Sequence, residues 1–303
     1  MAFLYALPGA IAEGMIWGLM AIGVYISYKI LDIADLTVDG SICTGACVCA
    51  VLLSLGVPVW ICLPVAFVAG ALAGMVSGLL HTVLGIPSIL AGILTQLMLY
   101  SVNLLILGGK SLIAVDHRAS TLLVHMSDNP GAILSMSIVI TAAIVILWLF
   151  FYTEVGLTLK STGDNPDMSR AQGVDVNRNK VIGLALANGI VALAGALLAQ
   201  YKGSANINDG RGAIVIALAA IFIGLSVSLK IKPNFVVSLI GVVGGGIVYY
   251  IVYNFVILMG LKTDYLKMLS AIIVALFLGI PYLKAEHFTK QKAPQKTGGH
   301  ADA

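Results

Sequence analysis

Charged residues are scarce in this sequence. Only 10% of its 303 residues are Asp, Glu, Lys or Arg, whereas charged residues make up about 25% of an ordinary soluble domain. Hydrophobic residues make up 59% of the chain, and the mean hydropathy is +1.01. The length would suit one large or two ordinary soluble domains, but a composition this poor in charge excludes that class. The net charge of +3 is also too small to indicate a nucleic-acid-binding protein.

The residue patterns of an enzyme or of a metal site are missing as well. Four cysteines lie inside apolar segments, and no His or carboxylate completes a ligand set with them. These cysteines are Cys43, Cys47, Cys49 and Cys62. We expect them to be small packing residues. Ser, His and Asp residues are scattered without a nucleophile motif, so we expect no catalytic residue, metal or cofactor in this chain.

A phosphate-binding loop is also absent. Lys160 and Ser161 are similar to the last two residues of such a loop. However, Leu159 stands where the GxxxxGK[ST] pattern requires glycine, and the glycine-rich cradle is missing. The energy for any transport must therefore come from a partner protein or from an ion gradient.

Long apolar runs are what the sequence does contain. Runs of about 20 apolar residues match the thickness of a bilayer, where each backbone polar group must be satisfied internally, so they become helices. The sequence therefore predicts an all-α protein, a polytopic transmembrane helical bundle of about eight to ten spans, as one domain over residues 1–283. The expected spans are 8–28, 36–55, 58–80, 87–108, 132–152, 180–201, 212–229, 234–259 and 265–283.

Both ends of the chain need a separate interpretation. The first 25 residues lack a basic leading region and contain Glu13, so we expect a first membrane helix rather than a cleaved signal peptide. Residues 284–303 are predicted to be a disordered basic tail. The side of the membrane on which the N-terminus lies stays open.

The basic residues predict the orientation, because Lys and Arg near span ends favour the cytoplasmic side. They gather in the tail, in the turn at 228–234 and in the middle loop at 156–180. Alternating spans place all three on one side, so these loops and the C-terminus are predicted to be cytoplasmic. The loops expected to face outward are 109–131, 202–211 and 260–264.

Glycine is abundant, with 33 residues, and part of it is patterned. Small residues four apart on a membrane helix let two backbones approach closely. The patterned glycines are Gly14 and Gly18, then Gly70, Gly74 and Gly78, with a further run in GVVGGGIVYY at 241–250. This pattern indicates close packing between helices, either within one subunit or between two.

The middle loop at 156–180 carries seven charged residues in an otherwise apolar chain. Asp164 or Asn165 can cap a helix there, and Pro166 suits its first position. Asp167 falls in the first turn, where the helix dipole favours an anion.

The same loop also contains signals that end the helix. Arg170 lies near its end, and Gly173 is placed to terminate it, which predicts a helix of about two turns at 166–172. A helix this short is marginal in water. It is either a kink in a solvated loop or an element that docks into a partner.

The stretch DLTVDG at 35–40 places acidic residues between two apolar spans. Acidic residues inside a membrane are costly and tend to mark a pathway. A broken helix here, with Thr37 as cap and Gly40 allowing close approach, would line a transport cavity. Alternatively, Asp35 and Asp39 cap the next helix at a water-exposed turn. A second Asp-Gly pair at 209–210 is compatible with an inverted internal repeat.

Other polar residues within the spans either contact substrate or form hydrogen bonds between helices. The candidates for a substrate pathway are Asp35, Thr37, Asp39, Ser41, Thr95, Gln96, Asn103 and Asn188.

Three segments of the chain resemble one family. The run GLTLKSTGDNPDMSRAQGVDVNRNKVIGLALANGIVALAGALLAQ resembles the cytoplasmic coupling-helix region of ATP-binding-cassette importer permeases, in the branched-chain amino acid and ribose group. The family's residues occur there in order as Gly173, Val174, Asp175, Val176, Lys180 and the step Ala194-Gly195-Ala196. The segments GMIWGLMAIGVYISYKILDIADLTVDGSICTGACV at 14–48 and RGAIVIALAAIFIG at 211–224 are similar to other parts of the family.

The resemblance covers most of residues 10–283. The DLTVDG stretch, together with GIPSILAGILTQLMLYSVNLLILGG at 85–109, looks most like the tryptophan/tyrosine-type permeases. The resemblance implies a type II ABC importer-like permease fold, an amino acid as substrate, with an aromatic one preferred, and the bacterial plasma (inner) membrane. A sugar or a nucleoside stays open as substrate.

The resemblance also implies partners. They are a second copy of this chain in a homodimer, two cytoplasmic ATPase subunits that carry ATP and Mg, and an extracytoplasmic solute-binding protein. The residues expected to couple to the ATPase are Asn165, Pro166, Asp167, Met168, Ser169, Arg170, Ala171, Gln172 and Gly173.

The predicted outer loops carry basic residues that suit carboxylates on a solute-binding protein, although ordinary solvated loop charges would look the same. They are Lys110, Arg118, Lys202, Arg211 and Lys262. The rival function is a secondary transporter driven by an ion gradient, with Asp35 or Asp39 as its coupling acid. A membrane scaffold or enzyme is disfavoured, because catalytic groupings are missing from the sequence.

Overall fold

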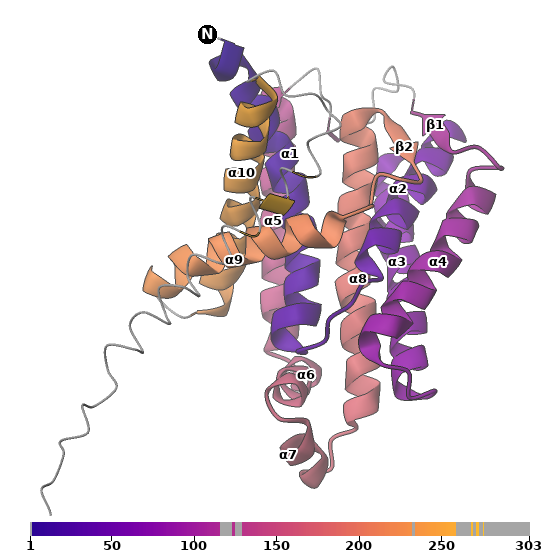
Figure 1. Ribbon diagram of the computed structural model, residues 1–303, viewed down its shortest axis with the longest axis vertical. Helices are drawn as coiled ribbons and strands as arrows, with labels where there is room; N and C mark the ends of the chain where they lie inside the picture. Colours follow the sequence, from indigo (N-terminus) through magenta and orange to yellow (C-terminus); the bar gives the residue numbers. More distant parts are fainter. Residues whose placement is uncertain are drawn as a thin grey trace, which may run out of the picture.

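The computed structural model describes residues 2–115, 123–124, 129–231 and 234–258, together with 268, 271, 272 and 275. The described part is a helical bundle with one small sheet (Figure 1). Its elements are α1 (Ala2–Tyr25), η1 (Ile26–Ile30), α2 (Val38–Ser54), α3 (Val59–Thr82), α4 (Ser88–Ile106), β1 (Leu112–Ala114), α5 (Asn129–Phe151), α6 (Glu154–Asp164), α7 (Pro166–Ala171), α8 (Val176–Lys202), β2 (Ser204–Asn206), α9 (Ala213–Ile231) and α10 (Phe235–Leu258).

Within the described residues, six helical segments are long and apolar enough to cross a membrane. They are Ala6–Ile30, which joins α1 to the π-helical turn η1, and the helices α3, α4, α5, α8 and α10. This confirms the prediction of an all-α polytopic bundle. The predicted span at 265–283 and the tail at 284–303 lie almost entirely outside the described residues.

Two of the predicted spans correspond to helices that do not run along the full length of the bundle. The span at 36–55 is the shorter helix α2, which is preceded by an irregular segment at 32–35. The span at 212–229 falls in α9, which runs across the other helices rather than along them (Figure 1). Both helices therefore begin inside the bundle.

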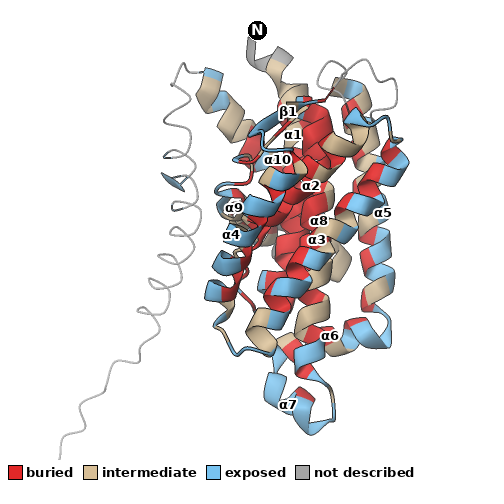
Figure 2. Ribbon diagram, turned by 90° about the vertical axis from the view of Figure 1, so that its right-hand side faces the viewer, coloured by how far each residue is buried: buried red, intermediate tan, exposed pale blue. Residues whose placement is uncertain are grey.

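Helix α8 forms the centre of the bundle. It packs against α3, α2 and α1, while α10 packs against α1 and α9. Buried residues concentrate along α8 and the helices beside it, whereas α5 shows much exposed surface (Figure 2). The exposed residues of α5 are mostly apolar, as expected for a surface that meets lipid tails.

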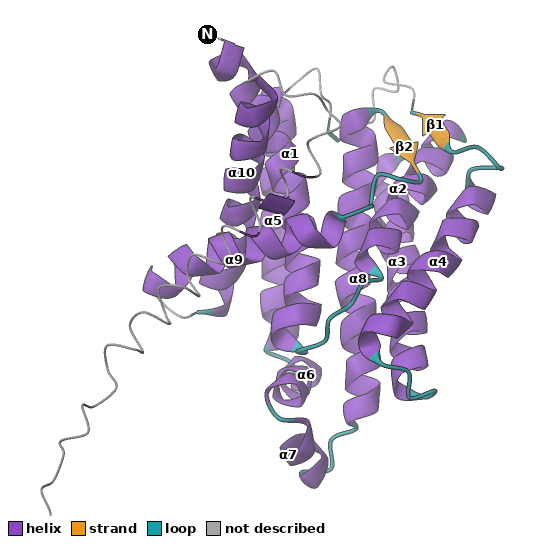
Figure 3. Ribbon diagram, viewed as in Figure 1, coloured by secondary structure: helices purple, strands orange, loops and turns teal. Residues whose placement is uncertain are grey.

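The small sheet marks one end of the molecule. Strands β1 and β2 pair antiparallel, with Leu112 opposite Asn206. The sheet lies at the end opposite α7, and α1 begins at the sheet end (Figure 3). Segments from the two predicted outer loops, 109–131 and 202–211, therefore lie together on one side.

The patterned glycines that are spaced four residues apart pack within this chain. A Cβ placed on Gly70, Gly74 or Gly78 would meet residues of α8. A Cβ on Gly14 or Gly18 would lie 2.8 Å from the Cα of Ile247 or 3.0 Å from that of Val243, both on α10. Of the two alternatives, packing within one subunit is therefore confirmed for these glycines.

Two adjacent glycines of α10 give a matched test of this packing. A Cβ on Gly245 would overlap the carbonyl oxygen of Ala220 on α9, whereas a Cβ on Gly244 has nothing within 4 Å. We expect Gly245→Ala to lower the free energy of unfolding by about 1–3 kcal/mol through overpacking. Gly244→Ala should leave it unchanged or raise it by up to about 1 kcal/mol, because alanine favours a helix. Thermal unfolding in detergent measures both variants, and equal midpoints would contradict the predicted contact.

Candidate functional site

The polar insert folds into two short helices at one end of the bundle. Asn165 begins α7 as its N-cap, because its Oδ1 accepts a hydrogen bond from the Met168 N–H at 3.0 Å. Pro166 occupies the first turn, and Gly173 follows the helix with a φ of +82°. The helix predicted at 166–172 is confirmed to within one residue, with Asn165 rather than Asp164 as the cap.

Sequence reasoning missed α6, which precedes α7. Its signals were present, because Thr153 caps the helix by accepting from the Gly156 N–H at 3.3 Å and Glu154 lies in the first turn. From the sequence we predict only the second of these two short helices.

Helix α7 projects from the bundle with most of its surface exposed (Figure 2). Met168 is 59% exposed although it is apolar. Asp167 and Arg170 form an ion pair at 3.7 Å with both side chains mainly in solvent, so the pair adds little stability. An open groove of about 370 Å³ lies between α6 and the segment that follows α7 into α8, and its lining includes Glu154, Asp175 and Arg178. Helix α7 therefore offers one large exposed apolar side chain and charges of both signs.

The insert is fixed to the rest of the protein at defined points. Asn179 of α8 donates to the Thr162 hydroxyl of α6 at 3.0 Å, and Ser169 of α7 donates to that of Ser161 at 3.3 Å. Gly163 packs directly on the backbone of Ile30, where a Cβ would overlap the carbonyl oxygen. These contacts connect α7 through α6 to η1 and α8.

The segment after η1 turns back into the bundle and reaches α2 (Figure 1). Asp32 adopts a left-handed conformation with a φ of +55°, and Asp35 and Thr37 are buried. The alternative of a water-exposed turn therefore does not hold for Asp35.

Four of the predicted pathway residues form a buried hydrogen-bond cluster. The Asp35 carboxylate accepts from the Thr37 N–H at 2.9 Å and from the Asn188 side chain at 2.6 Å. Ser41 donates to the Asn188 Oδ1 at 2.6 Å, and the hydroxyls of Thr37 and Ser77 are hydrogen-bonded. The cluster ties the 31–37 segment, α2, α3 and α8 together at one point. Because its members satisfy one another, it works as a structural joint rather than an open binding site.

Asp39 caps a helix that is distant in sequence. Its carboxylate accepts from the backbone N–H groups of Gly212 and Ile214, both at 2.9 Å, at the start of α9. Asp39 itself lies in the first turn of α2. The N-termini of two helices that begin inside the bundle thus meet at one anion, which complements both helix dipoles.

The two Asp-Gly pairs noted in the sequence lie against each other. A Cβ on Gly210 would overlap the carbonyl oxygen of Asp39. The Gly210 N–H also donates to the Cys43 sulfur at 3.0 Å. This sulfur is therefore a hydrogen-bonded packing group at the meeting point of α2 and the 207–212 segment.

A cavity of about 440 Å³ opens next to this meeting point, between α2, α4 and the 207–211 segment. It lies toward the sheet end, because the Ile207 N–H donates to the Ser111 carbonyl oxygen at 3.2 Å, directly before β1. The residues that line it are Asp39, Gly40, Cys43, Gln96, Leu97, Tyr100, Asn103, Ile207 and Arg211. Three predicted pathway residues, Asp39, Gln96 and Asn103, meet here.

Of the remaining candidates that the structure describes, most lie apart from this cavity. Thr95 is buried and donates to the Ala91 carbonyl oxygen of its own helix at 3.0 Å. Lys110 and Lys202 are exposed near the small sheet, whereas Arg211 lines the cavity. Arg118 and Lys262 fall outside the described residues.

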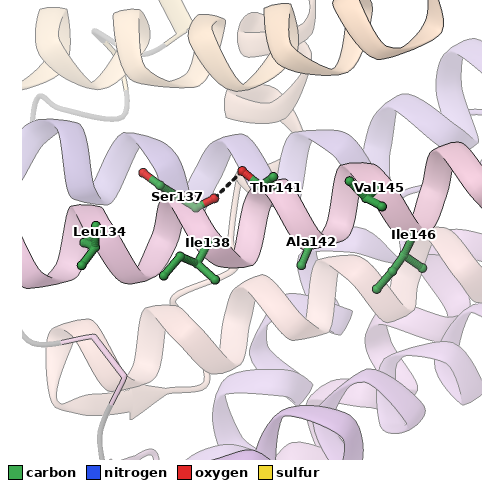
Figure 4. A pocket seen from close by; sticks show the side chains of 7 residues that line it. All are labelled: Leu134, Ser137, Ile138, Thr141, Ala142, Val145 and Ile146. Carbon is green, nitrogen blue, oxygen red and sulfur yellow. Dashed lines mark hydrogen bonds between the residues drawn. The ribbon is translucent and has the colours of Figure 1, made fainter.

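A second hollow lies on the outer face of α5 and is lined by that helix alone (Figure 4). Its two polar side chains bond within the helix, because Thr141 donates to the Ser137 carbonyl oxygen and Ser137 to that of Ile133, both at 2.7 Å. The other lining residues are apolar: Leu134, Ile138, Ala142, Val145 and Ile146. This hollow suits a lipid tail better than a polar solute.

Comparison with known proteins identifies similar chains. Residues 7–278 match the family described as branched-chain amino acid transport system / permease component. A tyrosine transport system permease protein of Clostridioides difficile (strain R20291) is 34% identical over 268 residues, which cover 88% of each chain. An uncharacterized protein of Rickettsia prowazekii (strain Madrid E) is 30% identical over 91% of this chain and 97% of its own length.

A more distant relative covers part of the chain. The autoinducer 2 import system permease protein LsrC of Escherichia coli (strain K12 / DH10B) is 31% identical over 62% of this chain and 55% of its own length. No solved structure matches the chain.

Proposed function

This chain belongs to the family of branched-chain amino acid permease components, and from that premise we propose that it is the permease subunit of an ATP-driven importer for an amino acid. The Clostridioides difficile relative is named for tyrosine transport, which supports an amino acid, with an aromatic one preferred. The bacterial plasma (inner) membrane is the proposed location, with α7 and the C-terminus in the cytoplasm and the small sheet outside.

The observation that carries the proposal is the construction of α7. It is capped at both ends, exposed, and attached through α6 to two long helices of the bundle. A solvated loop needs none of these features. A helix of about two turns is unstable in water unless something holds it, so its caps and its attachment indicate an element that docks onto a partner. We propose that residues 165–173 enter a groove of a cytoplasmic ATPase subunit, with Met168 as the apolar contact.

The proposed assembly has two copies of this chain, two ATPase subunits that hold ATP and Mg, and an external solute-binding protein at the sheet end. Lys110 and Lys202 are exposed there and suit carboxylates of the binding protein. Closure of the ATPases would push α7, and the contacts of Gly163 with Ile30 and of Asn179 with Thr162 would carry the motion to α1 and α8. The Asp35 cluster on α8 would then move α2 and α3.

Transport in proteoliposomes tests the source of energy. With the copurified ATPase and the binding protein present, we expect uptake of tyrosine or phenylalanine to need ATP on the side of the membrane where the ATPase subunits lie. Ionophores that collapse proton and sodium gradients should leave the uptake rate unchanged. Uptake that needs a gradient and ignores ATP would overturn the proposal in favour of a secondary transporter.

A further inference from the structure

The cavity between α2, α4 and the 207–211 segment contains a buried acceptor that lacks a partner. Asn103 is 1% exposed, and its Oδ1 has no hydrogen bond among the described residues. An unpaired buried polar atom is costly, so such an atom in a native protein calls for an explanation. Because Asn103 lines the cavity, a ligand that donates a hydrogen bond there would remove this cost.

The same cavity is lined by one side chain of each charge sign. Asp39 uses its carboxylate to accept from two backbone N–H groups at the start of α9. Arg211, two residues before α9, is exposed and forms no ion pair within the described part of the chain. The guanidinium is therefore available for an anion, and a planar guanidinium binds a carboxylate through two parallel hydrogen bonds.

The remaining lining suits the side chain of a small molecule. Leu97, Tyr100 and Ile207 are apolar or aromatic, and Gln96 adds one amide. A volume of about 440 Å³ lies within the usual range of roughly 300–1,000 Å³ for small-molecule sites.

We propose that this cavity binds a free amino acid as its zwitterion during transport. The Arg211 guanidinium holds the carboxylate. The ammonium donates to the Asn103 Oδ1 and is attracted by the negative charge of Asp39. The amino-acid side chain packs against Leu97 and Tyr100. A neutral sugar would leave Arg211 without an anion, so the charge pattern favours the zwitterion. The assignment rests on the proposed transport function and places a solute-selecting site inside the permease itself.

Binding of matched analogues tests the assignment without transport. The full chain is kept in lipid nanodiscs with its copurified ATPase and without nucleotide, and thermal stabilisation is titrated with each compound. The probes are L-phenylalanine, phenylalaninamide, which lacks the carboxylate, N-acetylphenylalanine, which lacks the ammonium, and D-ribose. We expect phenylalanine to bind roughly 10- to 100-fold more tightly than either analogue, as for lost hydrogen bonds to charged groups, and ribose to bind no better than the analogues.

Two substitutions test the proposed contacts of the carboxylate and of the ammonium separately. Arg211→Gln should weaken phenylalanine binding by roughly 10- to 100-fold and leave phenylalaninamide binding unchanged. Asn103→Leu should weaken phenylalanine and phenylalaninamide but leave N-acetylphenylalanine unchanged. Lys29→Gln is the control, because Lys29 is an exposed cation in η1, at the end of the bundle away from the small sheet, and it should bind like the wild type.

The outcomes separate this inference from the proposed function. Equal binding of phenylalanine and both analogues, ribose binding as tight as phenylalanine, or an Arg211→Gln variant that binds normally would each overturn the site. ATP-driven uptake without any phenylalanine binding by the permease would also overturn the site while leaving the proposed function intact. Uptake that needs an ion gradient would overturn the proposed function, and the analogue series would still decide the site.

Discussion

Replacing residues 165–172 with a Gly-Ser linker of equal length is expected to release the ATPase subunit and to abolish ATP-driven uptake. The linker removes the Asn165 cap, the exposed Met168 and the charges of Asp167 and Arg170. It leaves the bundle intact, because only Ser169 of α7 is buried. Copurification from membranes measures the first effect and proteoliposome uptake the second. Both signals should fall below about a tenth of wild type, as for loss of the central contact of an interface.

A pair of single substitutions makes this test more specific. Met168→Glu should weaken ATPase binding at least roughly tenfold, because a charge replaces the proposed apolar anchor. Val83→Glu is the matched control, since Val83 is 72% exposed in the turn between α3 and α4 and should bind the ATPase normally. If the linker variant keeps its ATPase and its uptake rate, α7 is not the coupling element.

Asp39→Ala is expected to reduce uptake more than any other single substitution inside the bundle. The variant leaves the N–H groups of Gly212 and Ile214 without their acceptor and removes the anion shared by two helix N-termini. It also removes the negative charge from the cavity that we assign to the solute. Uptake per folded protein should fall by about 100-fold, which corresponds to two lost charged hydrogen bonds of roughly 1.5 kcal/mol each.

The loss of uptake should be smaller for a milder change of Asp39, and it should not occur when another nearby aspartate is changed. Asp39→Asn keeps one acceptor oxygen without the charge, so we expect it to retain roughly a tenth of the uptake rate. Asp209→Asn is the control from the second Asp-Gly pair, because within the described part of the chain the Asp209 carboxylate accepts only from the nearby Asn206 N–H at 3.2 Å. Gel filtration and thermal midpoints report whether each variant folds. A folded Asp39→Ala variant with wild-type uptake would contradict the role that we give to this carboxylate.

Local signals were enough to predict α7. A side-chain cap, a proline at the first position and a terminal glycine act over a few residues, so Asn165, Pro166 and Gly173 mark where the helix begins and ends. The bundle itself was predictable for a similar reason. Apolar runs of membrane length have few structural options, because their backbone groups must bond internally.

Partners distant in sequence could not be predicted. Asp39 was expected either to cap its own helix or to line a pathway, whereas its carboxylate accepts from N–H groups at 212 and 214. Arg211 was assigned to docking of a binding protein because it is a basic loop residue, and only the fold brings it to the same cavity as Asn103. Neither pairing has a local sequence signal.

The sequence by itself determined that the chain is a helical membrane protein with a capped polar insert, because hydropathy and helix caps act over short distances. The tertiary structure decided which polar groups meet. It joined Asp35, Ser41 and Asn188 into one buried cluster and brought the starts of α2 and α9 together at Asp39. The physical reason is that a buried polar side chain needs a partner, while the choice of that partner depends on how the helices pack.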